Sequence, residues 1–566
     1  MCEAGPLGDE GPLMTQEDHR PMTRPSIRWR RPWRAIGLLA MICLPAPALA
    51  QGVSPTAAAL TPAQMDAAWR QGSAKAAHER EVLLRKVAAG DAAGPFRPDW
   101  ESLRTWRVPE WYADAKFGIF IHWGVYSVPA FGSEWYSRRM YIQGSKEYQH
   151  HLAVYGTPDK FGYKDFIPLF KAEKYDPRAW AALFRASGAR YVVPVAEHHD
   201  GFAMYATRLS DWSALRMGPK RDLIGDLVRA VRAQGLHLGL SSHRAEHDWF
   251  FGEGRKIPSD VNDPRYADLY GPAEARLTAE DTGDTQLTGD FTYVSQAWLD
   301  DWTARTAELV EDYHPDLIYF DWWISHPAFR ATLPKFLAYY YNTQGRRGAS
   351  AVVNYKEGAL AAGSGVADVE RGLMPDIQPR VWQTCTSLGD YSWGYIEGEQ
   401  YKSPERIIHL LADIVSKNGN LLLNIGPRAD GTIPQEAQDR LLAIGAWLKT
   451  NGEAIYGTRP WRQFGEGPAR MASGSFKEGQ TDRPFGPEDF RFTTKGDILY
   501  AIELGWPEGG EATIHALPAG VAVKVVTLLD GGAGQALSFH QDEDGLHLAV
   551  PKRAPGDYAF VYRIER

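Results

Sequence analysis

Residues 116–129 read KFGIFIHWGVYSVP, and this stretch decides the fold. Its apolar run is short, rich in Phe and Ile, and bounded by Lys116 and Gly124, which favours a strand buried on both faces over a helix. His122 then lies where a buried strand meets its loop, the position at which barrel enzymes carry catalytic side chains. Taken alone, His122 is equally consistent with a structural histidine, so other segments must decide its role.

Between about residues 96 and 456, apolar strand-like runs alternate with amphipathic stretches. This alternation is typical of β/α units and predicts an α/β domain built on a parallel sheet. In one of the intervening helices, Ser403 is the predicted N-cap, Pro404 the first turn and Gly419 the stop. The predicted strands are residues 117–123, 191–195, 236–240, 317–321, 351–354 and 420–425.

Two further regions flank this domain. Residues 51–95 are rich in Ala, Gln and charged residues, with a helical pattern near 65–87, and predict a helical lead-in or linker. Residues 457–566 contain short apolar runs separated by Gly, Pro, Asp or Glu, which predicts a C-terminal antiparallel β-sandwich. These runs are residues 490–494, 498–504, 512–516, 521–529, 546–550 and 558–564.

The first 50 residues resemble an export signal rather than part of the fold. A basic region at 28–34 precedes an uncharged apolar stretch at 35–44 and the small residues Ala48-Leu49-Ala50. We therefore expect cleavage near Ala50 and an exported protein, either periplasmic or secreted. Met14 and Met22 are alternative start sites, and Arg30-Arg31 leaves a twin-arginine route open.

Composition narrows the range of partners. The formal net charge of −8 argues against nucleic acid as a partner, and no segment reaches the roughly 20 apolar residues of a membrane span. Cys2 and Cys43 lie in the predicted signal, so Cys385 would be the one thiol of the mature chain, without an intramolecular disulfide. The 20 Trp and 26 Tyr suit stacking on sugar rings as well as core packing. A homo-oligomer is left open.

Polar and aromatic side chains follow several predicted strands. Residues 197–202 read EHHDGF, residues 241–243 read SSH, and residues 320–323 read FDWW. Adjacent His198 and His199 cannot face the same side of an extended strand, and neither an HExxH helix nor a Cys–His set is present, so we predict no metal and no other cofactor. Two neutral imidazoles instead suit hydrogen bonds to neighbouring sugar hydroxyls.

Asp321 is the strongest candidate for a nucleophile. It follows an apolar strand among aromatic residues, where a charged carboxylate needs a partner or a purpose. The alternative is a structural Asp that caps the next helix. Glycoside hydrolysis with retention needs a second carboxyl group, and the residue pattern alone does not choose among Glu357, Asp368, Glu370, Asp376, Glu397 and Glu399.

Five separated motifs resemble the α-L-fucosidases of glycoside hydrolase family 29. They are residues 116–129, Ser133-Glu134-Trp135-Tyr136, residues 197–202, the strand that ends at Asp321, and residues 416–427, SKNGNLLLNIGP. The resemblance covers about residues 96–460. It implies a (β/α)8-like barrel followed by a β-sandwich, and exo-acting hydrolysis of terminal α-L-fucose from oligosaccharides or glycoconjugates, with retention through a covalent fucosyl-enzyme.

The resemblance also implies roles for individual residues. The fucose-binding groups of the family fall on His122, Glu134, Trp135, His198 and His199, and its nucleophile falls on Asp321. The family's acid/base lies in a variable stretch before a Trp-(Glu or Gln)-Thr-Cys-Thr segment, which is residues 382–386 here. Gln383 cannot supply a proton. Glu370 is therefore our prediction for the acid/base, with Asp368 and Glu397 in reserve.

Three departures from the family pattern concern the sugar platform. Tyr319 stands where many members have Trp, and Ser241-Ser242 stand where many have two Tyr. Lys356 stands where some members have Arg and offers a point charge rather than a fork. We expect Tyr319, Lys356 and Trp393 to contact substrate. His243 and His247 have no secure counterpart in the family and either contact substrate or lie on a loop.

Two other functions stay open at this stage. The chain could be a barrel hydrolase for another sugar, or a non-catalytic carbohydrate-binding protein on the same fold. The long segment 250–292, rich in Asp, Gly and Thr, either folds over the cleft or lies away from it.

Overall fold

The computed structural model describes residues 61–276, 292–356 and 358–566. The predicted export signal, the start of the predicted lead-in, Glu357 and part of the 250–292 segment lie outside the described residues. Export and cleavage near Ala50 therefore stay predictions. Among the helices of the described ranges, none combines the length and the apolar character needed to cross a membrane.

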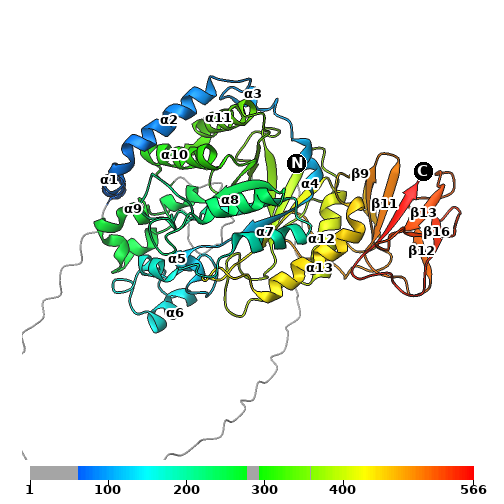
Figure 1. Cartoon of the computed structure of the whole chain (residues 1–566). Helices are drawn as coiled ribbons and strands as arrows, with labels where there is room; N and C mark the ends of the chain where they lie inside the picture. Colours follow the sequence, from blue (N-terminus) through cyan, green and yellow to red (C-terminus); the bar gives the residue numbers. More distant parts are fainter. Residues whose placement is uncertain (1–60, 277–291, 357) are drawn as a thin grey trace, which may run out of the picture. The chain divides into compact units, whose positions relative to one another are not determined.

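The domain that follows the lead-in is a closed barrel of parallel strands (Figure 1), which confirms the predicted (β/α)8-like fold class. Each strand pairs with the next in sequence, and β1 also pairs with β8, with Phe117 opposite Leu421 and Ile121 opposite Ile425. The strands are β1 (Phe117–Ile121), β2 (Tyr191–Glu197), β3 (His237–Ser242), β4 (Leu317–Phe320), β5 (Val352–Tyr355), β6 (Val366–Glu370), β7 (Trp382–Ser387) and β8 (Gly419–Ile425).

The opening stretch of sequence forms β1, whose residues are all buried as predicted. The strand ends at Ile121 rather than at Trp123, because His122 and Trp123 already belong to the loop. The backbone N–H of His122 still donates to the carbonyl of Ile425 on β8, at 3.1 Å. This contact fixes His122 at the mouth of the barrel.

Strands β6 and β7 were not predicted from the sequence. The burial of β6 alternates, and β7 reads Trp-Gln-Thr-Cys-Thr-Ser, so neither resembles an apolar run. Their polar side chains satisfy one another inside the barrel: Gln383 on β7 donates to Asp368 on β6 at 2.6 Å, and Cys385 contacts the same carboxylate at 3.0 Å. Closure of the barrel therefore stabilises strands that hydrophobic pattern alone does not reveal.

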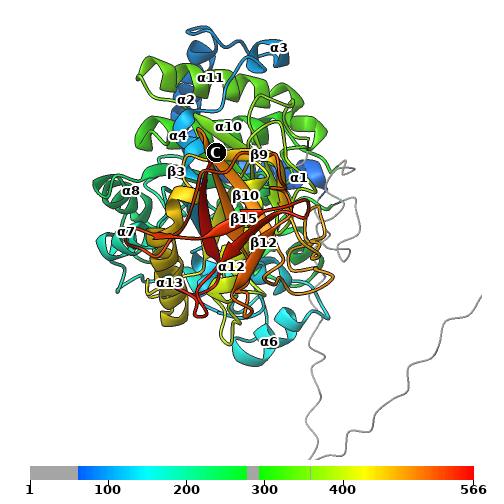
Figure 2. The same cartoon turned by 90° about the vertical axis from the view of Figure 1, so that its right-hand side faces the viewer.

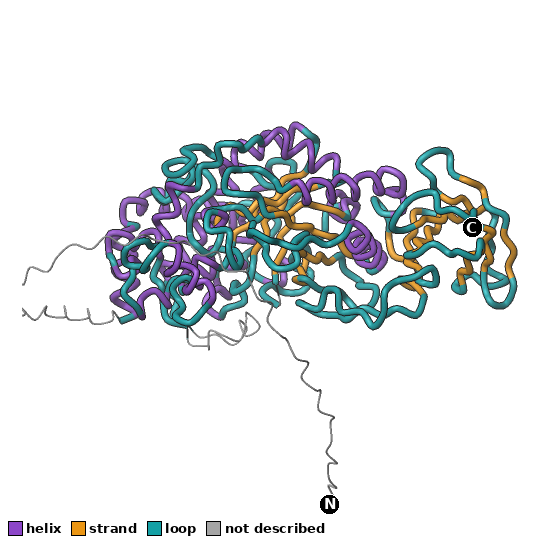
Figure 3. The backbone as a smooth tube through the Cα atoms, turned by 90° about the horizontal axis from the view of Figure 1, so that it is seen from below, coloured by secondary structure: helices purple, strands orange, loops and turns teal. Residues whose placement is uncertain are grey.

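Helices surround the barrel, as Figures 1 and 3 show. Ser403 caps α12 by accepting from the backbone N–H of Arg406, as predicted. Gly419 is not its stop: α12 ends at Ser416, Asn418 turns the chain with φ 73°, and Gly419 begins β8, where a Cβ atom would lie 2.6 Å from Ile414. The larger helices are α7 (Pro177–Ala186), α8 (Leu223–Ala233), α10 (Gln296–Tyr313), α11 (Leu333–Arg346), α12 (Pro404–Ser416) and α13 (Gln435–Asn451).

The predicted lead-in is helical and packs on the barrel domain. Helix α1 (Pro62–Gly72) starts in a capping box between Thr61 and Gln64, and α2 (Ala77–Asp91) follows it after one short turn. Helix α2 contacts both α10 and α11, and Arg80 on α2 donates to the buried Asp301 on α10 at 2.8 Å. This region is therefore part of the folded domain rather than a linker.

The C-terminal region forms antiparallel sheets (Figure 2), as predicted, and these sheets have their own apolar core. One sheet has the order β14-β13-β17-β11-β10-β9 and the other β12-β16-β15. Arg491 on β10 donates to the buried Asp413 on α12 at 2.6 Å, which ties this domain to the barrel. The strands are β9 (Arg459–Glu466), β10 (Phe490–Lys495), β11 (Ile498–Glu503), β12 (Glu511–Ile514), β13 (Val525–Leu528), β14 (Gln535–Ala536), β15 (Phe539–Gln541), β16 (Leu546–Ala549) and β17 (Phe560–Glu565).

Candidate active site

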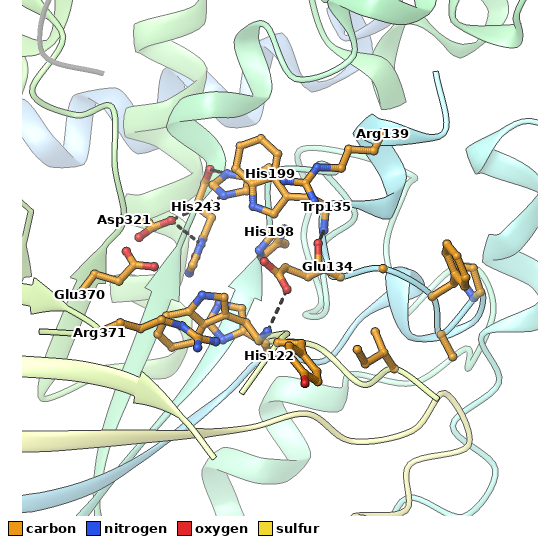
Figure 4. A pocket seen from close by; sticks show the side chains of 18 of the residues that line it. His122, Glu134, Trp135, Arg139, His198, His199, His243, Asp321, Glu370 and Arg371 are labelled. Atoms are coloured by element: carbon orange, nitrogen blue, oxygen red, sulfur yellow. Dashed lines mark hydrogen bonds and ion pairs between the residues drawn. The ribbon is translucent and has the colours of Figure 1, made fainter. Parts of the chain in front are cut away.

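A cavity of about 720 Å³ opens at the ends of the barrel strands (Figure 4). Parallel strands bring their carboxyl ends to one face, so side chains far apart in the sequence meet there. Nearly all the predicted site residues line this cavity: His122, Glu134, Trp135, His198, His199, Tyr319, Asp321, Glu370 and Trp393. Lys356 is the exception.

His122 follows β1 and is held by Asn424 on β8. Its Nδ1 lies 2.8 Å from the Asn424 side-chain oxygen, while the Asn424 amide donates to the carbonyl of Trp393 at 2.7 Å. The amide orientation makes its oxygen the acceptor, so Nδ1 of His122 carries the proton and Nε2 is left as an acceptor. Burial also lowers the pKa of His122 well below its usual value, which keeps the ring neutral.

His198 and His199 both line the cavity, with ring centroids 4.3 Å apart. The two neighbouring histidines do not face opposite sides, because β2 ends at Glu197 and the chain turns immediately afterwards. Nδ1 of His199 donates to the carbonyl of His243 at 2.9 Å, which leaves Nε2 as an acceptor. Burial and the neighbouring His243 lower the pKa of His199 to about 3.

Glu134, Trp135 and Trp393 form another wall. One carboxylate oxygen of Glu134 accepts from the backbone N–H of Trp393 at 2.9 Å and from the hydroxyl of Ser392 at 3.1 Å. The indole of Trp135 lies 5.4 Å from the ring of His199. This wall joins aromatic faces to a carboxylate whose orientation is fixed, a combination suited to a sugar ring.

Asp321 directly follows β4 and contacts two histidines through the same oxygen. Its Oδ2 lies 3.1 Å from Nδ1 of His243 and 3.6 Å from Nε2 of His199. Burial by itself would raise the pKa of Asp321, but the charges of His243 and Lys356 hold this pKa well below its usual range. Asp321 is therefore ionised.

Glu370 is the last residue of β6 and is also held through one oxygen. Its Oε2 accepts from the indole N–H of Trp322 at 2.6 Å and lies 3.0 Å from Nζ of Lys356. Burial raises the pKa of Glu370, and the negative charge of Asp321 raises it further, while Lys356 opposes both effects. Glu370 therefore retains its proton to a higher pH than an ordinary glutamate.

Lys356 lies behind Glu370 rather than in the cavity. It is 2 % exposed, and its ammonium contacts Asp368 at 2.7 Å, Glu370 at 3.0 Å and Cys385 at 3.2 Å. These contacts use all three N–H donors, so the expected contact between Lys356 and substrate is not what this geometry favours. Where some family members carry the forked guanidinium group of arginine, this chain carries the single ammonium group of Lys356. That ammonium group contacts the carboxyl group of Glu370.

The other carboxyl groups considered as acids lie in different places. Asp368 is buried and fully engaged by Lys356, Gln383 and Cys385. Glu399 accepts from backbone N–H groups of Tyr391 and Ser392, and Asp376 is exposed. Glu397 lines the same cavity as Glu370. Of Glu370 and Glu397, Glu370 is the one that lies on a barrel strand. It also contacts Trp322, which is next to Asp321 in the sequence.

The sequence analysis left the roles of His243 and His247 open and gave no sign of Phe476. His243 lines the cavity beside Asp321, whereas His247 binds the carbonyl of His199 through Nδ1 at 2.7 Å and holds the loop. Their only signal was their place after the third strand. Phe476, from the segment after β9, also lines the cavity and stacks with Trp322 at 6.1 Å, and no local pattern indicated this contact.

Imidazole nitrogens gather closely in this cavity. Within the ranges that the structure describes, His122, His198 and His243 bring one nitrogen each within 4.8 Å of one another, and so do His199, His243 and Asp321 with one ligand atom each. Burial lowers the pKa of His198 as well as that of His122, so these rings are neutral acceptors or donors. Neutral imidazole nitrogens of this kind can also hydrogen bond to the hydroxyl groups of a sugar. The absence of a metal from the reaction stays a prediction.

Comparisons with known proteins agree with this geometry. Residues 83–453 match the α-L-fucosidase family model, and residues 485–565 match the model of the α-L-fucosidase C-terminal domain. The tissue α-L-fucosidase of Rattus norvegicus is 34 % identical over 84 % of this chain and 94 % of its own length. The human tissue α-L-fucosidase is 34 % identical over 83 % of this chain and 91 % of its own length.

Solved structures give the same result. The α-fucosidase of Thermotoga maritima, in complex with a mechanism-based inhibitor, has a TM-score of 0.66 and 33 % identity, and the match covers 83 % of this chain and all of that chain. The family models, the relatives and the fold agree, which confirms the resemblance seen in the sequence motifs. The chain therefore belongs to the α-L-fucosidase family of glycoside hydrolases.

Proposed function

We propose that this enzyme is a retaining, exo-acting α-L-fucosidase that removes terminal α-L-fucose from oligosaccharides or glycoconjugates through a covalent fucosyl-enzyme. One observation carries the proposal: two carboxyl groups, Asp321 and Glu370, line one cavity and have pKa values displaced in opposite directions. Such a pair divides the nucleophile and acid roles between chemically similar groups.

The neutral histidines position the sugar. Nε2 of His122 and Nε2 of His199 are free to accept because the other nitrogen of each ring already donates. Hydroxyl groups of fucose therefore donate to these two rings. Trp393 and Trp135 offer apolar faces beside them, against which the methyl edge of the sugar packs.

The first chemical step uses both carboxyl groups. Asp321 attacks the anomeric carbon while Glu370 gives its proton to the departing oxygen, so a carbon–oxygen bond to Asp321 replaces the glycosidic bond. Trp322 and Lys356 occupy Oε2 of Glu370, which leaves Oε1 as the oxygen that carries the proton.

The second step reverses these roles. Water attacks the anomeric carbon, its proton passes to Glu370, and the bond to Asp321 breaks. Each step inverts the anomeric carbon, so the product retains the configuration of the substrate. The natural substrate is a fucosylated oligosaccharide or glycoconjugate, and no cofactor enters either step.

Proton NMR of the first product tests the proposal. Hydrolysis of an aryl α-L-fucoside should release α-L-fucose first, followed by slow mutarotation. The first appearance of β-L-fucose would exclude retention. A parallel panel of aryl α-galactosides and xylosides should show far lower kcat/KM than the fucoside, and an equal or higher value on one of them would redirect the assignment to that sugar.

A further inference from the structure

His243 is fixed in the cavity by its backbone as well as by its ring. Its N–H donates to the carbonyl of Glu197 at the end of β2, and its own carbonyl accepts from Nδ1 of His199, each at 2.9 Å. The residue is 3 % exposed. Both of its peptide groups are therefore engaged by the neighbouring strand end, and the ring has little freedom to move away from Asp321.

Among the described residues, the rings that pack against His243 are neutral. His198 lies against it at a centroid distance of 4.8 Å, His122 at 5.1 Å, and Phe120 and Tyr319 at 6.2 Å. His199 packs on the ring at 5.2 Å and is neutral, as are His122 and His198. The charged group that the ring contacts is Asp321, beyond which lie Glu370 and Lys356.

The two histidines beside Asp321 are not equivalent. Nδ1 of His199 donates to the His243 carbonyl, so a neutral His199 presents a lone pair at Nε2 and cannot donate to Oδ2. No such constraint applies to His243, whose Nδ1 lies 3.1 Å from Oδ2. Neither ring nitrogen of His243 has a hydrogen-bond partner among the described residues, and Asp321 Oδ2 lies within ion-pair distance of Nδ1. A proton on Nδ1 would therefore make a hydrogen bond to Oδ2 once the ring turns its N–H toward that oxygen.

We propose that His243 is a positioning residue that donates its Nδ1–H to Oδ2 of Asp321, so that Oδ1 is the oxygen that attacks and later leaves the anomeric carbon. This inference rests on the proposed function and assigns a residue to the second step in particular. In the first step Oδ1 forms its bond to carbon, Oδ2 becomes the ester carbonyl oxygen, and the proton of Glu370 leaves with the departing group. In the second step the carbon–Oδ1 bond breaks and negative charge returns to both oxygens.

A hydrogen bond to Oδ2 is stronger when Asp321 is a carboxylate than when it is an ester. It therefore stabilises the transition state for breakdown of the fucosyl-enzyme, in which carboxylate charge returns to Asp321. In the first step the same hydrogen bond makes Asp321 a weaker nucleophile. Loss of His243 should slow the second step more than the first. The fucosyl-enzyme then accumulates, which lowers kcat and KM together on an activated aryl fucoside.

A matched pair of variants tests this role. The amide nitrogen of asparagine can take the position of Nδ1, whereas that of glutamine can take the position of Nε2, so His243→Asn should keep the hydrogen bond and His243→Gln should lose it. On 2-chloro-4-nitrophenyl α-L-fucoside we expect kcat of His243→Gln to fall about 10- to 100-fold, with a lower KM. The kcat of His243→Asn should be about ten times higher than that of His243→Gln.

The acid limb of the kcat/KM profile is the second readout. Because His243 favours ionised Asp321, His243→Gln should move this limb to higher pH, and His243→Asn should restore it. Equal kcat, KM and acid limbs for the two variants would overturn the inference, as would a loss of activity with KM raised and the limb unmoved. Fucose binding and melting temperature confirm that both variants fold. If the wild-type enzyme itself releases β-L-fucose first, the proposed function fails instead, which keeps the two failures distinct.

Discussion

Asp321 and Glu370 stand in one cavity at the ends of β4 and β6, yet their surroundings differ. Asp321 contacts imidazole rings and is held ionised, whereas Glu370 contacts an indole and an ammonium group and is held protonated to higher pH. Figure 4 shows the two side chains beside each other, with His243 next to Asp321. Both carboxyl groups lie at the ends of barrel strands, so in the proposed mechanism the partners rather than the residue type decide which one attacks and which one donates a proton.

Removal of Asp321, the proposed nucleophile, should have the largest effect. Asp321→Gly should lower kcat on aryl α-L-fucosides by about 10⁴-fold, because the covalent step is lost while the binding groups remain. Added azide should partly restore turnover by occupying the space of the missing carboxylate, and the product should be β-L-fucosyl azide. Near-normal activity in this variant, or azide rescue that gives the α-azide, would contradict the role of Asp321.

Replacement of Glu370, the proposed acid, should have a smaller effect that depends on the substrate. Glu370→Gln should lower kcat/KM by about 10²- to 10⁴-fold on fucosylated oligosaccharides, whose leaving groups need a proton. The loss on 2,4-dinitrophenyl fucoside should be much smaller. Glu397→Gln serves as the control, since Glu397 lines the same cavity but is not on a barrel strand. Equal losses on good and poor leaving groups would move the acid role away from Glu370.

Exchange of the ammonium group beside Glu370 should shift the pH profile rather than abolish activity. Wild-type kcat/KM should fall on the acid side below the usual Asp range, as Asp321 protonates, and on the basic side above the usual Glu range, as Glu370 ionises. Lys356 lowers the pKa of Glu370, so its removal should raise that pKa and move the basic limb to higher pH, by about one unit.

The double variant Lys356→Met with Asp368→Asn is the one to measure. Removing both partners avoids leaving a buried, uncompensated carboxylate, which would itself destabilise the barrel. The acid limb should rise less than the basic limb, because Lys356 contacts Glu370 but not Asp321. A basic limb that stays in place, or moves to lower pH, would show that Lys356 does not tune the acid.

Cys385 should give the smallest effect of this network. Its thiol contacts Lys356, Asp368 and Tyr319, and burial raises its pKa well above the usual value. Cys385→Ser should change kcat/KM by less than about tenfold, and iodoacetamide at pH 8 should leave Cys385 unmodified in the native enzyme but label it after unfolding. Rapid labelling of Cys385 in the native enzyme, with loss of activity, would mean that the surroundings of Glu370 are open to solvent.

Sequence patterns predicted most of the fold because its decisive signals are local. The apolar run of β1 and the Ser403-Pro404 start of α12 depend on neighbouring residues alone. Strands β6 and β7 carry polar residues inward and exist because the barrel brings those residues together. Their stability is a property of the closed sheet, which no single segment displays.

The same distinction applies to the site. Asp321, His122 and the His198-His199 pair could be placed because each follows a recognisable strand. The positions of Lys356 behind Glu370 and of His243 beside Asp321 depend on the relative height of side chains from different strands, which sequence spacing does not give. From the sequence, the candidate catalytic groups were thus easier to locate at the barrel mouth than the residues that contact them.

The central claim is that Asp321 carries the sugar in a covalent intermediate. The most direct measurement is digestion and mass spectrometry of the enzyme after reaction with 2-deoxy-2-fluoro-L-fucosyl fluoride, whose fluorine slows breakdown of the intermediate. We predict one fluorofucosyl group, attached by an ester to the peptide that contains Asp321, and its release with return of activity on incubation. A label on another carboxylate would contradict the account, as would turnover of this reagent with no labelled enzyme at any time.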